Sequence, residues 1–184
     1  MKDMKTVIDL FERSCEKFPD NPYLWEKKNG KFAATSYMEV KREVLNFAGA
    51  LCQLGMDRGD RIALLSEGCN AWVYSELGML YAGGVNVPLS IKLTDNEIVF
   101  RVEHSQARFL IVSANFLSRV RGIEGRIGGV EKIIVIHSDI NEGKYVSFEL
   151  LQREGEIWRG EHKELMNDRI HTVTEDDLVN ISYT

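Results

Sequence analysis

The stretch from Arg61 to Pro88 reads RIALLSEGCNAWVYSELGMLYAGGVNVP and decides the fold. Its first residues, Arg61–Leu65, form an apolar run with the length of a buried strand. Asn70–Tyr81 is apolar on most sides, which predicts a buried helix, and Val85–Val87 predicts a short strand that Pro88 ends. A strand, a helix and a strand in this order predict a parallel pair joined by a right-handed crossover.

The same alternation continues towards the C-terminus. Thr94 and Glu97 have the spacing of a capping box, which predicts a helix that runs to about His104. Phe109–Val112 and Ile133–Ile136 are apolar runs of strand length. We therefore expect an α/β fold, with an open, mainly parallel sheet and helices on both faces. Residues 61–140 form the core of this arrangement.

The sequence of residues 1–60 predicts a helix, a small hairpin and a long helix. Thr6 and Asp9 form a capping box for the first helix, Thr6–Lys17. The apolar face that we expect for it consists of Val7, Leu10, Phe11 and Cys15. Asn29-Gly30 is a hairpin signal between the expected strands Tyr23–Lys27 and Lys31–Thr35.

The long helix is expected to begin after Ser36, which forms a capping box with Glu39. It is expected to end at Gly55, because helices commonly end at a glycine with a left-handed backbone conformation. Its expected core stripe is Val40, Val44, Phe47, Ala48 and Leu51.

The C-terminal part of the chain divides into two segments. Residues 141–173 are charged and less regular, so we expect a surface insertion or lid in which Ser147 caps a short helix to Arg153. In residues 174–184, Thr174–Asp177 has capping-box spacing, and Leu178–Thr184 alternates apolar and polar residues as a half-buried strand does. A parallel strand needs a covering helix, and none follows. We therefore expect the chain to be the incomplete N-terminal portion of a longer protein.

Composition excludes several classes of protein. The formal net charge of −5 and the lack of a basic run argue against a nucleic-acid binder. Cys15, Cys52 and Cys69 have no C-x-x-C spacing and indicate reduced thiols, hence a cytoplasmic protein. Asp9 and Glu12 interrupt the N-terminal segment, so it is no secretory signal. Leu77–Leu89 is too short to span a bilayer, although a membrane surface stays compatible with the sequence.

Motifs of catalytic chemistry are missing. There is no G-x-x-x-x-G-K-[ST] loop, no G-x-G-x-x-G after a strand, no G-x-S-x-G elbow and no H-E-x-x-H. We interpret the glycines at 122–129 as a turn, Gly83-Gly84 as close helix–strand packing, and Trp72 with Leu77 and Leu80 as core. The four histidines lack metal-ligand spacing. We therefore assign no catalytic residue and no metal ligand within these residues.

Several segments together resemble the acyl-CoA synthetases of the AMP-forming adenylating superfamily. Leu54–Leu65 is similar to the family's L-G-V-x-x-G-D-R-V-A-I segment, and Ile181–Thr184 resembles the lead-in to its phosphate loop, Y-T-S-G-T-T-G-x-P-K-G. Further pieces in matching order are Trp72, Leu77-Gly78, Tyr81–Leu89, Leu93-Thr94, Glu97-Ile98 and Ser105–Val112. Ser66–Trp72 departs from the pattern, because only the serine and tryptophan of S-x-N-R-P-E-W remain.

The resemblance implies an ATP-dependent fatty-acid–CoA ligase, which adenylates a carboxylate and then forms a thioester. ATP, Mg²⁺ and CoA are the implied cofactors of the complete protein, and this segment alone is expected to be inactive. By resemblance, Thr184 is the first hydroxyl of the ATP phosphate loop. Phe18–Pro22 and the charged segment Glu149–His171 favour a long-chain fatty acid.

Alternatives remain open at this stage. They are an aryl- or short-chain acyl-CoA ligase, an adenylation domain, and a stand-alone flavodoxin-like module without chemistry. Acyl chain length and oligomeric state also stay open.

Overall fold

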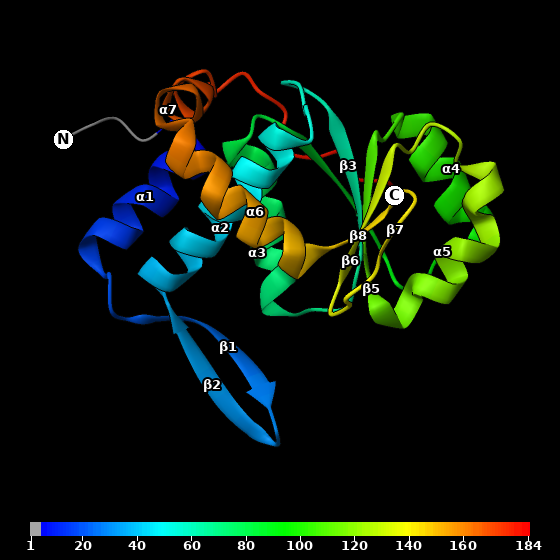
Figure 1. Cartoon of the computed structure of the whole chain (residues 1–184), viewed down its shortest axis with the longest axis horizontal. Coiled ribbons are helices and arrows are strands. Elements are labelled where there is room, and N and C mark those ends of the chain that lie inside the picture. The colour runs from blue at the N-terminus through cyan, green and yellow to red at the C-terminus, as the bar shows by residue number, and fades with distance from the viewer. Residues whose placement is uncertain (1–4) are drawn as a thin grey trace.

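The computed structural model describes residues 5–184 and shows a six-stranded sheet with helices on both sides (Figure 1). The strand order is β4-β3-β5-β6-β8-β7, and every pair is parallel except β7 with β8. The strands are β3 (Arg61–Leu65), β4 (Val85–Leu89), β5 (Phe109–Ser113), β6 (Lys132–Ile136), β7 (Asn141–Glu142) and β8 (Tyr145–Ser147). The expected α/β fold and the strands expected at Arg61–Leu65, Phe109–Val112 and Ile133–Ile136 are confirmed.

The helices divide between the two faces of this sheet (Figure 1). On one side lie α1 (Val7–Lys17), α2 (Tyr37–Gln53), α3 (Asn70–Tyr81), α6 (Phe148–Glu161) and α7 (Lys163–His171). On the other lie α4 (Asp95–Ser105) and α5 (Leu117–Ile123), with the short 3₁₀ turns η1 (Ala114–Phe116) and η2 (Glu124–Arg126). Two apolar cores result, one on each face. Within residues 5–184, no helix is both long and apolar enough to cross a bilayer.

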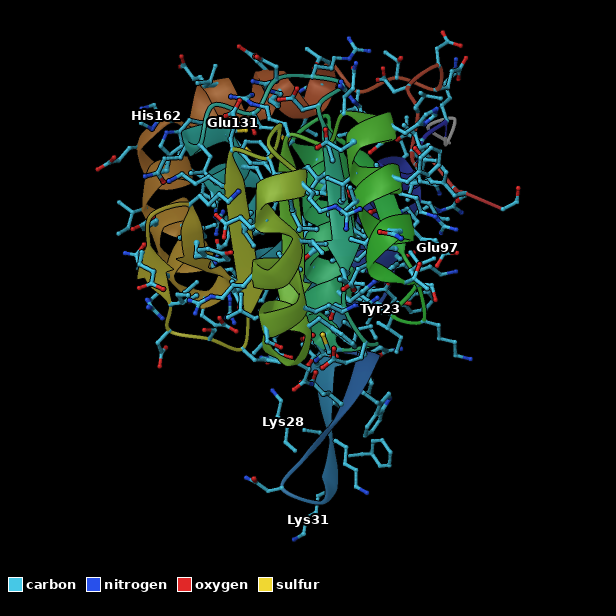
Figure 2. All side chains as sticks on the ribbon, turned by 90° about the vertical axis from the view of Figure 1, so that its right-hand side faces the viewer. Tyr23, Lys28, Lys31, Glu97, Glu131 and His162 are labelled. Carbon is cyan, nitrogen blue, oxygen red and sulfur yellow. The ribbon has the colours of Figure 1, made fainter. Side chains whose placement is uncertain are left out.

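A hairpin of β1 (Pro22–Lys28) and β2 (Lys31–Ser36) projects from the body, with Lys28 and Lys31 at its tip and Tyr23 at its base (Figures 1 and 2). Asn29 and Gly30 both have positive φ angles, 51° and 81°, as an Asn-Gly hairpin turn requires. The hairpin prediction is therefore confirmed.

Capping boxes start three of the helices. Thr6 with Asp9, Ser36 with Glu39 and Thr94 with Glu97 each form both reciprocal hydrogen bonds. The expected apolar face of α1 was wrong in part, since Ile8, Phe11 and Cys15 are buried while Val7 and Leu10 are exposed. Packing against α3, and not hydrophobicity alone, decides which face of α1 is buried. On that face the Phe11 ring lies perpendicular to the ring of Tyr81 on α3.

The expectation that Pro88 ends its strand was also wrong, because β4 continues to Leu89. The backbone N–H and C=O of Asn86 both point to the open edge of the sheet, where they bond Val179 and Ile181. Pro88 lies two residues further along the same strand, so its missing N–H falls on that edge and costs no ladder bond with β3.

Residues 141–173 are not the irregular insertion or lid that we expected. β8 extends the sheet beside β6, and α6 and α7 continue the helical layer. Ser147 does cap a helix, but α6 runs to Glu161 rather than Arg153. Its close fit against α2 stabilises it, because the tilted rings of Phe148 and Phe47 lie with their centres 4.6 Å apart and a Cβ on Gly49 would lie 2.7 Å from the Gly155 carbonyl oxygen.

Trp72 is only half-buried, whereas Leu77 and Leu80 are buried as expected. A fully buried tryptophan costs about 3–5 kcal/mol when replaced by alanine, so Trp72→Ala should cost about 2 kcal/mol. Urea unfolding of the two proteins measures the difference in free energy. A change near zero would mean that Trp72 contributes nothing to the core and would reopen a role in binding.

Candidate functional site

The C-terminal segment, residues 174–184, lies along the outer edge of β4. The strand expected over Leu178–Thr184 is reduced to one parallel bridge, in which Asn86 donates to the Val179 carbonyl at 3.1 Å and accepts from Ile181 at 2.9 Å. Leu178 is exposed, and among the described residues the segment has a paired strand on one side only. Pro88 occupies the next position of β4 that faces this edge, and it has no N–H to donate, so the ladder does not extend beyond the bridge.

The helical turn expected before this segment is also absent. Asp177 accepts the Thr174 backbone N–H at 2.7 Å, as in a capping box, but the residues make a turn without a helix. The Asp177 carboxylate instead receives two hydrogen bonds from Arg58, at 2.6 and 2.8 Å. The Thr174 N–H and the Arg58 guanidinium lower the pKa of Asp177. This charged pair fastens the start of the segment to the loop after α2.

Tyr183 fastens the end of the segment to α4. Its hydroxyl lies 2.9 Å from His104 Nδ1, and its ring meets the rings of Phe100 and His104 edge-on. The Arg101 guanidinium lies 5.4 Å from the centre of the Tyr183 ring. The alternation of the sequence thus places Ile181 and Tyr183 against the core on the α4 side.

Thr184 follows at once and is exposed. Because the segment runs parallel to β4, it heads for the carboxyl edge of the sheet, where ligands of open α/β sheets bind. Among the described residues, the Thr184 hydroxyl has no hydrogen-bond partner. The role of Thr184 in binding ATP phosphates stays a prediction.

A polar cluster at the carboxyl edge went unnoticed in the sequence. Glu67, after β3, accepts hydrogen bonds from Ser113 at the end of β5 and from Asn115. Burial opposes ionisation of Glu67, but the hydrogen bond from Ser113, supported by the one from Asn115, lowers its pKa overall. Its position directly after a buried parallel strand was the signal that could have identified it.

The glycines provide turns and close packing. Gly83 has a φ of +81°, and a Cβ on Gly84 would lie 3.2 Å from Met56, so this pair joins α3 to β4 as expected. The glycines at positions 122, 125, 128 and 129 face open space.

A pocket of about 120 Å³ lies between α1, α3 and the C-terminal segment. It is smaller than the about 300 Å³ that small-molecule sites usually occupy.

The three cysteines are free, and burial raises the pKa of each thiol. They are therefore protonated at neutral pH and poor nucleophiles. Although no metal-ligand spacing was found in the sequence, the fold brings Cys69 and His137 together with Glu26.

The family model described as AMP-binding enzyme matches residues 11–184, nearly the whole chain. The chain belongs to the AMP-binding enzyme family. This agrees with the segment order that suggested AMP-forming acyl-CoA synthetases.

Two curated relatives and one crystal structure illustrate the similarity of this AMP-binding enzyme. Long chain acyl-CoA synthetase 1 of Arabidopsis thaliana is 31% identical over 115 residues, which cover 60% of this chain and 17% of the relative. An uncharacterised acyl-CoA ligase of Bacillus subtilis (strain 168) is 24% identical over 178 residues, 97% of this chain and 31% of the relative. The crystal structure of an anthranilate CoA ligase with anthranoyl-AMP has a TM-score of 0.73 and 27% identity, covering 80% of this chain and 27% of that one.

The chain thus spans less than a third of the length of these relatives. Its fold is that of the adenylate-forming ligases over the shared part.

Proposed function

We propose that this AMP-binding enzyme is, in its complete form, an ATP-dependent acid–CoA ligase. A carboxylate oxygen of the acid attacks the α-phosphorus of ATP, the bond to the β-phosphate oxygen breaks, and pyrophosphate leaves. The sulfur of CoA then attacks the acyl carbon of the acyl-adenylate, its proton is released, and AMP leaves. The observation that carries the proposal is the family match over residues 11–184, and the anchored segment that leads to Thr184 at the carboxyl edge of the sheet supports it.

Thr184 is the residue that we assign to ATP. A hydroxyl and backbone N–H groups at the end of a parallel strand are suited to phosphate oxygens, because ligands gather at that edge and preorganised donors stabilise the developing charge. In this proposal Asp177 and Tyr183 do not touch ATP but hold the segment that carries Thr184. We assign no residue of this chain to Mg²⁺ or CoA and expect those ligands to be held by residues beyond this segment.

We further propose a long-chain fatty acid as the substrate and the cytoplasm as the place of action. The support for the substrate is the resemblance at Phe18–Pro22 and the similarity to a relative named for long-chain acyl chains. The charged segment Glu149–His171 no longer supports it, because α6 and α7 are part of the scaffold. An aromatic acid is the second candidate, since the matching crystal structure is that of an anthranilate ligase.

ATP–pyrophosphate exchange tests the proposal in the complete protein with a panel of fatty, aryl and short-chain acids. Exchange should depend on the acid and be fastest with a long-chain fatty acid, and residues 1–184 alone should give none. An enzyme inert with every acid would contradict the ligase proposal. A preference for aryl acids would contradict only the substrate.

Thr184→Ala tests the assigned residue in the same assay. Loss of a hydrogen bond to a charged oxygen costs about 1.5–3 kcal/mol, so exchange should fall about tenfold to a hundredfold while the melting temperature stays unchanged. Ser182→Ala is the matched control, because Ser182 is also exposed but its hydroxyl is bonded to Asn180 at 3.1 Å. Equal losses in both variants would mean that Thr184 has no special contact with ATP.

A further inference from the structure

Glu26, Cys69 and His137 come from three separate elements and meet at one place. Cys69 precedes α3 and follows the carboxyl end of β3, and His137 directly follows β6. The carboxyl ends of these parallel strands share one edge of the sheet, and Glu26, in the middle of β1 and paired with Ala33, reaches it from the hairpin. The potential ligand atoms of the three side chains all lie within 4.8 Å of one another.

Glu26 is held in place by the start of α3. One carboxylate oxygen accepts the Asn70 backbone N–H at 3.0 Å, and Asn70 also donates to Thr35 on the second strand of the hairpin. A carboxylate has about four lone-pair sites, so this bond leaves Glu26 able to bind a cation. Lys28 lies 3.5 Å from the other oxygen but remains largely exposed and can turn away.

His137 is held by a second carboxylate and by an unusual backbone. Its φ is +60°, a left-handed conformation that few residues other than glycine adopt. Glu149 Oε1 accepts the His137 backbone N–H at 3.0 Å and lies 3.4 Å from Nδ1 of the same residue. With Nδ1 turned to Glu149, Nε2 is the nitrogen left for a ligand. A carboxylate behind a histidine ring is the usual support of a metal-binding histidine.

The donor set selects the kind of cation. Thiolate, imidazole and carboxylate together suit Zn²⁺ and similar transition metals, whereas Mg²⁺ and Ca²⁺ prefer oxygen alone. Zinc bonds of about 2.0–2.3 Å in a tetrahedron place ligand atoms about 3.3–3.8 Å apart, so small side-chain rotations close the site. Glu26 and Cys69 are half-buried and His137 is exposed, so these side chains have room to rotate.

We propose that Glu26, Cys69 and His137 bind a zinc-like transition-metal ion, with Glu149 as the residue that orients His137. Three protein ligands leave a fourth position for water or another small ligand. The ion would join the projecting hairpin to the carboxyl edge of the sheet. This inference does not depend on the ligase activity proposed above.

Cobalt(II) added to the complete, metal-free protein tests the site, because a thiolate bound to cobalt gives a charge-transfer absorption that other ligands lack. One equivalent should produce this band, and Zn²⁺ should displace it. Cys69→Ser should abolish the band and should fold at least as well as the wild type, since serine is a preferred N-cap residue and Cys69 occupies the N-cap of α3. Cys52→Ser is the matched control, as Cys52 is a second half-buried free cysteine, and it should keep the band.

Calorimetric titration with Zn²⁺ tests the other ligands. Glu26→Gln and His137→Ala should each weaken binding at least tenfold, and Glu149→Gln about tenfold to a hundredfold, the usual effect of losing the supporting carboxylate. Melting without metal establishes that each variant is folded. The proposal is overturned by a wild type without the band, by a band that survives in Cys69→Ser or vanishes in Cys52→Ser, or by Zn²⁺ affinities unchanged in the folded variants.

Discussion

Gly155→Ala should destabilise the protein by about 3 kcal/mol, because a methyl group has no room between α2 and α6. A Cβ at this position would lie 2.0 Å from the carbonyl oxygen of Asn46 and 2.6 Å from the backbone nitrogen of Ala50. Both are backbone atoms of a buried helix and cannot rotate away as a side chain does. The helices must therefore separate and loosen the contacts around Phe47 and Phe148.

Gly160→Ala is the matched control for this prediction. It lies in the same helix, but a Cβ there meets no atom within 4 Å. Alanine is a better helix former than glycine, so this variant should be more stable by up to about 1 kcal/mol. The two substitutions should shift the urea midpoint in opposite directions. Shifts of the same sign and size would show that α2 and α6 do not approach as closely as described.

The same glycine explains why the sequence misled us about residues 141–173. A charged segment with Gly155 and Gly160 is a weak helix by propensity, and β8 is only three residues long. Its structure comes from tertiary packing, as a glycine in one helix fits against a glycine in another. No local pattern reports such a contact. By contrast, β3, β5 and β6 were predictable because each is an apolar run that is buried on both faces.

The two candidate sites also differ in how far the sequence alone could predict them. Thr184 was predicted by resemblance to a motif, which depends on neighbouring residues in one segment. Glu26, Cys69 and His137 lie on three elements, so only the fold brings them together. The support for Thr184 was partly visible, since the alternation of the last residues predicted a half-buried strand, whereas the contact of Tyr183 with His104 depends on where α4 lies.

Tyr183→Ala should lower acid-dependent ATP–pyrophosphate exchange by the complete protein about a hundredfold, the order of loss that a displacement of about 1 Å can cause. The substitution removes the ring contacts with Phe100 and His104, the contact with the Arg101 guanidinium and the hydroxyl contact with His104. The segment that carries Thr184 then keeps the bridge to Asn86 and the ion pair between Arg58 and Asp177. The bridge and the ion pair both involve residues that precede Tyr183. Among the described residues, no contact then holds Thr184 in place.

Tyr183→Phe separates positioning from general damage. It keeps the ring against α4 and loses the hydroxyl's contact with His104, worth about 1 kcal/mol, and its long 3.5 Å bond to the Arg101 carbonyl, so exchange should fall only a few-fold. Thermal melting of the two variants should differ little, because Tyr183 is only half-buried at the rim of its core. If Tyr183→Ala exchanges pyrophosphate as fast as Tyr183→Phe, the anchor on α4 does not position the ATP-binding segment. If its melting temperature collapses instead, the loss of exchange reflects unfolding, and the segment belongs to the core rather than to the site.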